Sequence, residues 1–548
     1  MALSFFKIQR KIYILLFLLY FPVIINAQTF DMNENNIIDL GSPTAVTKIE
    51  ATKKNSNSSP YNYLLGIFEG STDSSFSDGF PIAMIKEDDV RNNPDTISVN
   101  AQCKENIQYI RYIPPNSNNA QFSQVIISTG GSSTGKNFLE TDLPLMVVKT
   151  ENSKEPDSTE TYINCYVTII NADGSVNLDN KKAEIRIRGH STASLAKKPW
   201  KIKFEKKQKV LDIDSNNKYK SWAVLANHYD ESLIRNHLAF EISRNIGLPF
   251  TPRCRFLDVI MNGSFRGNYY ICDQIEIKKG RVDIKIANDE DDPDITGGYL
   301  IEIDGRAGEE EKYFLTEKGL LGEIKDPDSD DITKKEENYI KLYLNKVEEQ
   351  VYLGNLQYLD LPTFYRYFIM QEFCGDIDTT LSSFHLTKRR GDDKLYFGPV
   401  WDYDLSFDSD DRLIPTNQKP LFTFYYGASA GTCRHFLKTI LLTNNSMSYI
   451  NQTWNELKQS ALTFDKLNSY ITTESNKILD SAKLNYYRWF NSKIENVEKE
   501  YKSNVAIVTN YVKQRFDRLT YLINTYDFAA EQFKINFSLL YILILSLL

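Results

Sequence analysis

The chain has 548 residues, of which 42% are hydrophobic and 13% aromatic, a composition that predicts a large folded core and excludes a disordered chain. At this length we expect two to four domains. Asp and Glu outnumber Lys and Arg by 72 to 64, and this acidic balance argues against nucleic acid as a partner.

The first 27 residues have the pattern of a secretory signal peptide. Lys7, Arg10 and Lys11 precede an apolar run over residues 12–25, and the small residue Ala27 follows. A signal anchor is the alternative, although the run is short for a full membrane span. Cleavage near Gln28 would remove three cations and take the formal charge from −8 to −11.

Residues 28–137 predict a small β-rich module of the β-sandwich type. Short β-type runs over 61–68, 107–112 and 124–128 are separated by Asn, Ser, Gly and Pro, and helix signals are few. The Gly- and Ser-rich stretch 130–135 is typical of a flexible linker rather than of a phosphate loop, because no Gly-Lys-Ser/Thr follows it. We therefore place a domain boundary there.

The next part predicts a strand that ends at Arg188, a small-residue loop with Gly189 and Ser191, and a strand over 199–204 that returns at once. In this layout backbone N–H groups can cover an anion. Alternation along the return strand places Lys201 and Lys203 on the same face, so either could point to a ligand. The lysines of this region are equally typical of a solvated face, and both interpretations stay open.

A helix is predicted over 232–246, and Gly247-Leu248-Pro249 ends it. Glu241 on this helix is a candidate to orient the phosphate-facing lysine, with a solvent-facing carboxylate as the alternative. Further along, Asn262-Gly263 predicts a tight hairpin turn, because this dipeptide favours the backbone conformation that two-residue turns need. A strand over 298–304 ends in acids.

The second half is predicted to be rich in helix, with two acidic clusters at its junction with the β-rich half. Asp376 and Asp378 follow a helix over 361–373, and Trp401-Asp402-Tyr403-Asp404 follows a strand over 394–397. Carboxylates beside aromatic residues are costly to bury without a cation, so the clusters predict a divalent metal site that serves phosphate chemistry. Capped turns are the alternative.

Residues 527–548 form a hydrophobic C-terminal tail, and residues 536–548 carry no charge. With the small residues Ala529 and Ala530 upstream, the tail is typical of a GPI-attachment signal or of a tail helix packed on the body. Six cysteines permit disulfides in an oxidising compartment, but a chain this large does not need them to fold.

Many short motifs in one order make the chain resemble the CotH (spore coat protein H) family of kinase-like proteins. The resemblance covers roughly residues 143–526, and we place the corresponding domain at 140–526. The motifs that carry it are Ile187-Arg188-Gly189-His190-Ser191-Thr192, Lys198-Pro199-Trp200-Lys201-Ile202-Lys203, Leu225-Ala226-Asn227-His228-Tyr229-Asp230, Leu233-Ile234-Arg235-Asn236, Met261-Asn262-Gly263, Tyr270, Asp273-Gln274-Ile275-Glu276, Gly298-Tyr299-Leu300-Ile301-Glu302-Ile303-Asp304, Asp376-Ile377-Asp378 and Gly398-Pro399-Val400-Trp401-Asp402-Tyr403-Asp404.

The resemblance implies an α+β chain with an atypical bilobal protein-kinase-like fold, in which a small β-sandwich-like domain precedes a β-rich N-lobe and an α-rich C-lobe. It also implies an enzyme that transfers phosphate from ATP, with Mg²⁺ or Mn²⁺, to Ser or Thr of secreted or coat proteins. Within it, Asp378 resembles the acid that positions the acceptor hydroxyl, and Asp402 resembles the metal-binding acid, supported by Asp404 and Asp376. The residues implied to bind the nucleotide are Arg188, Gly189, Ser191, Lys201, Lys203 and Glu241, while Ser383 and Lys388 would line the same cleft.

The chain departs from the family pattern at three positions. His190 and Thr192 stand where the family loop usually has Asn and Ser, and Asp376 stands where the family usually has Asn. These changes alter the groups that would meet phosphate, whereas Asp378 and Asp402 are intact.

A non-catalytic role is the alternative on the same resemblance. Fungal members of the family are surface-anchored invasins, so the chain could be an adhesin or a structural coat protein that binds a host or cell-wall ligand. In either role we expect a secreted or cell-surface protein that meets the membrane only through a lipid anchor.

Overall fold

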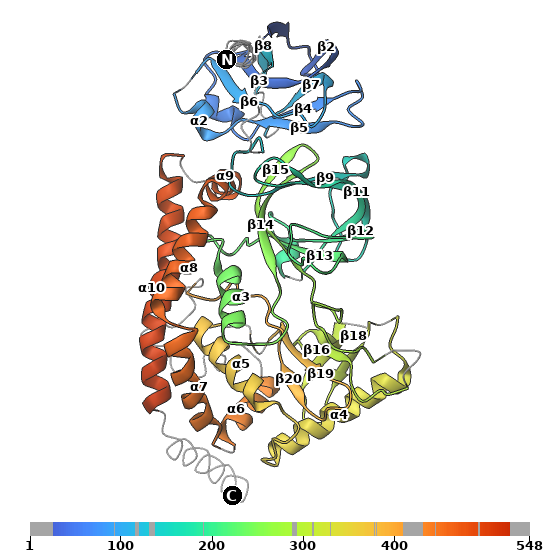
Figure 1. Cartoon of the computed structure of the whole chain (residues 1–548), viewed down its shortest axis with the longest axis vertical. Coiled ribbons are helices and arrows are strands. Elements are labelled where there is room, and N and C mark those ends of the chain that lie inside the picture. The colour runs from blue at the N-terminus through green and yellow to red at the C-terminus, as the bar shows by residue number, and fades with distance from the viewer. Residues whose placement is uncertain are drawn as a thin grey trace, which may run out of the picture. The chain divides into compact units, whose positions relative to one another are not determined.

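The computed structural model describes residues 26–525 apart from 93, 116–119, 131–136, 190, 288–292, 310–311, 329, 377–378, 380, 409–430, 444 and 491–493. It is a mixed α and β chain, which confirms the predicted fold class at that level (Figure 1). The signal segment up to residue 25, the C-terminal tail and Asp378 lie outside the described residues.

Two compact units divide the chain. The first lies within residues 1–153, 167–180 and 258–267, and the second within 154–166, 181–257 and 268–548. The candidate site residues that the structure describes, from Arg188 to Asp404, all fall in the second unit.

The N-terminal module consists of two antiparallel four-stranded sheets that pack face to face. Tyr112 and Phe68 of one sheet contact Phe122 of the other, with ring centroids 4.7 and 5.8 Å apart. Such aromatic pairs bury a large apolar area and explain why the aromatic-rich runs of this region form strands. The sheets are β1 (Asn26–Asp31), β8 (Phe122–Thr129), β3 (Val46–Lys53) and β6 (Thr96–Asn100), and β2 (Ile37–Thr44), β7 (Ile107–Ile113), β4 (Ile67–Ser71) and β5 (Phe80–Met84).

Seven strands close into a barrel. Along β12, Trp200, Ile202 and Phe204 are buried, whereas Lys201 is half-buried and Lys203 is exposed. Because successive side chains of a strand point to opposite faces, the apolar set fills the barrel and the two lysines project from its outer surface. In order, the strands are β10 (Ile163–Ile170), β11 (Val176–Ile187), β12 (Trp200–Gln208), β13 (Tyr219–Leu225), β15 (Ser264–Asp273), β14 (Cys254–Met261) and β9 (Leu145–Thr150).

The predicted hairpin at Asn262-Gly263 is confirmed, since it connects the neighbouring strands β14 and β15. Asn262 has φ 51° and Gly263 has φ 72°, the left-handed conformations that a two-residue turn of this kind requires. The side-chain oxygen of Asn262 accepts a hydrogen bond from the N–H of Thr150 at 3.0 Å, which ties the turn to the end of β9.

The second half of the chain contains a five-stranded antiparallel sheet as well as the predicted helices. Its order is β17 (Tyr313–Leu315), β18 (Leu321–Asp326), β16 (Tyr299–Ile303), β19 (Phe384–Lys388) and β20 (Leu395–Phe397). The helix-rich prediction for this half is therefore incomplete, because it lacks β17, β18 and β19. β17 has only three residues, and β18 and β19 are buried on both faces over most of their length, so none of them shows an alternating pattern.

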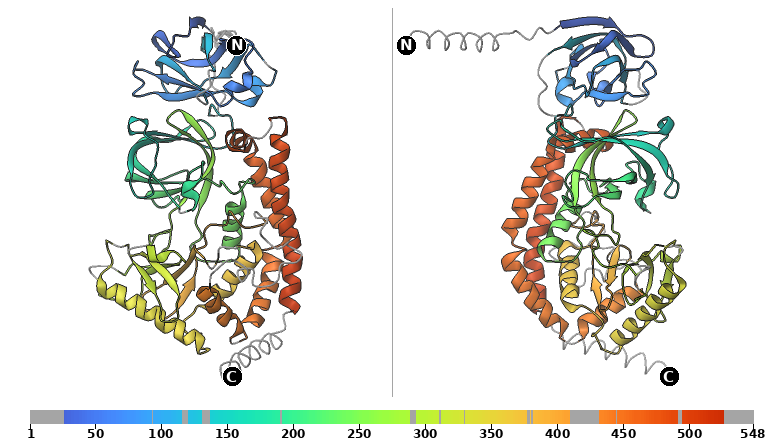
Figure 2. Two further views of the ribbon diagram at one scale, coloured as in Figure 1. Left: turned by 180° about the vertical axis from the view of Figure 1, so that it is seen from behind. Right: turned by 45° about the vertical axis from the view of Figure 1, so that its right-hand side comes forward.

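The helices of the second half pack on a long C-terminal helix. α10 contacts α5, α7, α8 and α9, and Figures 1 and 2 show it running alongside α8. The bounds are α3 (Arg235–Asn245), α4 (Lys334–Tyr352), α5 (Leu361–Cys374), α6 (Gly431–Leu442), α7 (Ser446–Ser460), α8 (Phe464–Lys477), α9 (Leu479–Trp489) and α10 (Val497–Thr525).

No helix within the described ranges is both long and apolar enough to cross a bilayer. The six cysteines are all among the described residues, and each has a free thiol.

A buried ion pair joins α10 to α5. Arg515 donates from Nε to the backbone oxygen of Glu372 at 2.7 Å and from Nη2 to its carboxylate at 2.9 Å, and both side chains are fully buried. α5 ends at Cys374, two residues before Asp376. The pair of Arg515 and Glu372 therefore fixes the helix that leads into the acidic cluster of Asp376.

We expect Arg515→Met to destabilise the protein by about 3–5 kcal/mol, because it leaves the Glu372 carboxylate buried without this cation. Urea unfolding of the full chain measures the loss. Lys502→Met on the same helix is the matched control, since it breaks an exposed pair with Glu498 and should change stability by less than about 1 kcal/mol. Equal effects of the two substitutions would contradict the prediction.

Candidate functional site

The loop with Asp402 and Asp404 is anchored through the residue between them. The backbone N–H of Tyr403 donates to Oδ1 of Asn236 on α3 at 2.7 Å. The Tyr403 hydroxyl accepts a hydrogen bond from Nε2 of Gln371 on α5 at 2.9 Å, and its side chain is almost fully buried. Two helices thus fix the position from which both acids project.

The carboxyl groups of Asp402 and Asp404 hydrogen-bond to each other. Asp404 is buried, and Asp402 has φ 69°, an uncommon conformation for a residue other than glycine. Asp402 keeps contact with solvent, but surrounding protein atoms remove part of its hydration and raise its pKa, while Arg188 opposes the shift. Two carboxyl groups in contact need a shared proton or a cation.

Arg188 brings the strand-loop-strand region to this acidic loop. Its backbone N–H donates to Pro199 O at 3.1 Å, which extends the pairing of β11 and β12 by one residue. Its guanidinium carbon lies 5.0 Å from the ring centroid of Trp401. Burial lowers the pKa of Arg188, and the charge of Asp402 raises it. Residues some two hundred positions apart therefore meet at one place.

The loop after Arg188 is exposed. Gly189 has φ 82°, and a Cβ at this position would lie 2.3 Å from Oγ1 of Thr192, so only glycine fits. Ser191 begins a 3-10 turn, η3 (Ser191–Ser194), in which Ser194 Oγ donates to Ser191 O at 2.8 Å. His190 lies outside the described residues.

Lys201 lies near enough to Arg188 for their charges to interact, whereas Lys203 lies two residues farther along β12. Lys201 lies opposite Arg186 on β11, and burial together with the charge of Arg186 lowers its pKa to about 8. Glu276 is the carboxylate that most opposes this shift. Lys203 is exposed opposite Glu184. The geometry thus favours Lys201 of the two lysines that the sequence left open.

Glu241 is held within its own helix, and the predicted role of orienting a lysine is not what its contacts show. It accepts hydrogen bonds from Arg244 at 3.1 Å and Asn245 at 3.0 Å. Residues three and four positions apart are neighbours on a helix surface, which explains both contacts. The carboxylate that acts on Lys201 is Glu276, from the segment after β15.

Glu302 on β16 is a site residue that the sequence did not single out. Its carboxylate lies 3.2 Å from Lys325 Nζ and 3.6 Å from His385 Nε2, and it accepts the N–H of Ser383 at 2.9 Å. Burial raises the pKa of Glu302, but His385 and Lys325 outweigh it and hold the pKa well below its usual range. Its charge in turn acts on both Arg188 and Asp402.

The cluster around Asp376 is only partly described. Asp376 is buried just after Gly375, whose φ of 66° ends α5, and Thr379 Oγ1 donates to its carboxylate at 2.9 Å. Burial raises the pKa of Tyr403, and the charge of Asp376 adds to this shift, so Asp376 lies near the acidic loop. Asp378 is outside the described residues. Lys388 is fully buried and donates to Thr296 O at 2.5 Å, so it does not line an open cleft as expected.

No group of three or more His, Cys, Asp or Glu side chains that could hold a metal ion occurs among the described residues. The pair formed by Asp402 and Asp404 is therefore the strongest candidate for a cation site within that part of the chain.

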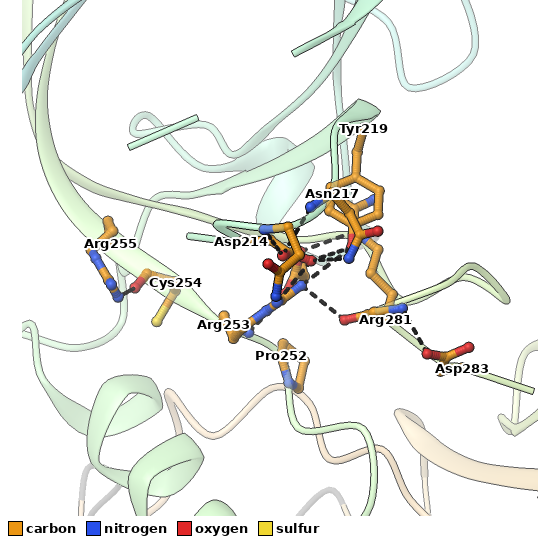
Figure 3. A network of polar contacts seen from close by, with 12 residues as sticks. Asp214, Asn217, Tyr219, Pro252, Arg253, Cys254, Arg255, Arg281 and Asp283 are labelled. Atoms are coloured by element: carbon orange, nitrogen blue, oxygen red, sulfur yellow. Dashed lines mark hydrogen bonds and ion pairs between the residues drawn. The ribbon is translucent and has the colours of Figure 1, made fainter. Parts of the chain in front are cut away.

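A second polar cluster lies on the opposite face of the barrel strands from Lys201. Arg253 pairs with Asp214 at 2.9 Å (Figure 3). Arg253 also pairs with Asp273 at 2.7 Å, and Arg281 pairs with Asp273 at 3.0 Å. Arg281 also contacts Glu276, which links this cluster to Lys201. The residues Phe250, Arg253, Asp273, Gln274, Arg281 and Val282 line an adjoining pocket of about 320 Å³.

Comparisons with known proteins support the resemblance seen in the motifs. A family model described as "CotH kinase protein" matches residues 185–519, which is more than half of the chain and includes every candidate site residue. No curated protein matches. Among solved structures, "CBM62 from Clostridium thermocellum Xyl5A" matches with 21% identity over 19% of this chain and 77% of that chain, at a TM-score of 0.16, too low to support an inference.

Lys201 should react with amine reagents at unusually low pH. Because burial and Arg186 disfavour its charged form, we expect half-maximal labelling at about pH 8 instead of near the ordinary pKa of 10.5. Labelling of the full chain at a series of pH values, read by peptide mass spectrometry, gives this midpoint. Arg186→Gln should move it upward, since a like charge is removed. A wild-type midpoint near 10.5 would contradict the described surroundings of Lys201.

Proposed function

Because the chain belongs to the CotH family, we propose that it is an atypical kinase that transfers phosphate from ATP to Ser or Thr of a secreted or coat protein. The observation that carries the proposal is that Arg188 meets the loop of the paired acids Asp402 and Asp404, with Lys201 near Arg188. Cations that bind phosphate next to acids that bind a metal are what phosphoryl transfer requires. In this proposal the barrel and the helix-rich part act as the two lobes of a kinase-like fold.

The acidic pair fits a divalent cation. The side chains of Asp402 and Asp404 are in contact, and Asp402 is exposed to solvent, so a cation can reach the pair. Mg²⁺ is usually held by one or two carboxylates, with phosphate oxygens and water completing its shell, so two acids are enough. Bound there, Mg²⁺ or Mn²⁺ would neutralise charge on the phosphates. Asp376 would support the pair formed by Asp402 and Asp404.

The remaining roles follow from charge and position. Lys201 and Arg188 would hold the phosphates. Transfer forms a bond from the acceptor hydroxyl oxygen to the γ-phosphorus and breaks the bond to the β,γ-bridging oxygen, so that ADP leaves. Asp378 would accept the hydroxyl proton, a role that rests on the family resemblance.

The family resemblance also supports a place for this activity outside the cell. We propose a secreted or surface-attached protein, held by a lipid anchor if the C-terminal tail is processed. The N-terminal sandwich would then be free to bind a cell-wall or host ligand, which is the role that an adhesin of this family would use instead of catalysis.

We expect the full chain to transfer labelled phosphate from ATP to a Ser-rich peptide with Mg²⁺ or Mn²⁺. Asp402→Asn and Lys201→Ala should each lower kcat/KM by about 100-fold or more, because each removes charge stabilisation of the transferring group. Lys182→Ala is the matched control, since its exposed ion pair with Glu205 lies away from the cluster. Thermal unfolding verifies that each variant is folded.

Absence of both transfer and nucleotide binding in the wild type would overturn the kinase proposal. If the same protein binds cells or cell-wall polymer, and Asp402→Asn binds equally well, the adhesin alternative is favoured.

A further inference from the structure

Arg186 and Lys201 form a pair of like charges on neighbouring strands. They lie directly opposite each other in the antiparallel ladder of β11 and β12. Residues so placed share a face, and their Cβ atoms are about 4.5–5.5 Å apart, so like charges there repel. Apart from burial, Arg186 is the strongest influence that lowers the pKa of Lys201. The repulsion therefore acts at the outer surface of the barrel, beside Arg188.

The neighbouring acids do not compensate for this repulsion. Glu276 pairs with Lys278 and Arg281, and Glu302 pairs with Lys325. Within the described residues, neither Arg186 nor Lys201 has a carboxylate partner. Moreover, Nε of Arg186 is buried without an acceptor in that part of the chain, and a buried donor without an acceptor is costly.

Arg186 also contacts an aromatic ring. Its guanidinium carbon lies 5.1 Å from the ring centroid of Tyr162. Arg188 lies over Trp401 in a similar way, at 5.0 Å. An aromatic ring supplies no oxygen acceptor, so these contacts leave both guanidinium groups able to donate to an oxygen ligand. Two arginines and a lysine thus gather in one place.

We propose that Arg186 is a phosphate-binding residue, which forms with Lys201 a clamp for the polyphosphate chain of the nucleotide. This inference rests on the proposed function for the identity of the nucleotide, and it adds a residue outside the motifs that suggested that function. A polyphosphate supplies the negative charge that the pair lacks. The planar guanidinium can donate two hydrogen bonds to one phosphate group, whereas Lys201 acts as a point charge.

The test is equilibrium binding of inorganic tripolyphosphate and of ATP to the full chain, with adenosine as a phosphate-free probe. Arg186→Gln should weaken binding of tripolyphosphate and ATP about tenfold or more, because it removes charge-assisted hydrogen bonds. Adenosine binding should not change. Arg186→Lys, which keeps the charge but not the two-point geometry, should fall between the wild type and Arg186→Gln.

Lys182→Gln is the matched control, because Lys182 is an exposed cation four residues earlier on the same strand. It should bind tripolyphosphate as the wild type does, and thermal unfolding should show all variants folded. If Arg186→Gln does not fold, Arg186→Lys carries the test alone. Wild-type affinity for tripolyphosphate in the folded Arg186 variants, or no binding by the wild type, overturns the clamp.

The phosphate clamp and the kinase proposal can be disproved independently of each other. Arg186-dependent binding of tripolyphosphate in a protein that transfers no phosphate supports the clamp and overturns the kinase. Phosphate transfer by a protein whose tripolyphosphate binding does not depend on Arg186 supports the kinase and overturns the clamp.

Discussion

The candidate site depends on the anchoring of Tyr403, the residue between two acids whose side chains contact each other. Asn236 holds its backbone and Gln371 holds its hydroxyl, so one helix on each side fixes the loop. Without these bonds, the loop that brings Asp402 and Asp404 together would lose two of its anchors. The folded chain thus keeps the two carboxyl groups in contact, an arrangement that is stable when a proton or a cation is shared between them.

Other elements of the second unit are also linked to the helices and the loop that hold Tyr403. Gln371 lies on α5, and Arg515 of α10 ties the end of α5 through Glu372. Arg188 reaches Trp401, so the barrel strand β11 is also coupled to the loop. Elements that are distant in sequence are therefore held by contacts that converge on four residues, 401–404. This convergence explains why the acids and the basic strand meet although nothing in the local sequence links them.

Much of the fold was predictable because its signals are local. Alternation placed the buried and projecting residues of β12, and Asn262-Gly263 fixed the hairpin between β14 and β15. The meeting of Arg188 with Asp402 was predictable only from the family resemblance. The role predicted for Glu241 rested on its position in a helix. Helical spacing gives the neighbours of a side chain on its own helix but not the other elements that it faces.

The residues that were missed are those whose roles depend on strand register. Glu302 lies opposite Glu323 on one side and His385 on the other, and no sequence pattern gives these partners, since they come from strands far apart in the chain. Arg186 likewise looked like one more polar residue of an alternating strand. Its significance arises only when β12 places Lys201 across from it.

Charge balance distinguishes the two faces of the barrel strands. On one face, Asp214 and Asp273 match Arg253 and Arg281, so that cluster needs no ligand. On the other face, Arg186 and Lys201 have no carboxylate partner among the described residues, because Glu276 and Glu302 pair with other cations. Arg281 links the two faces, since it forms an ion pair with Glu276. If Glu276 were released, it could pair with Lys201 and neutralise it. The balanced cluster therefore keeps the opposite face positive, which is the condition for binding an anion there.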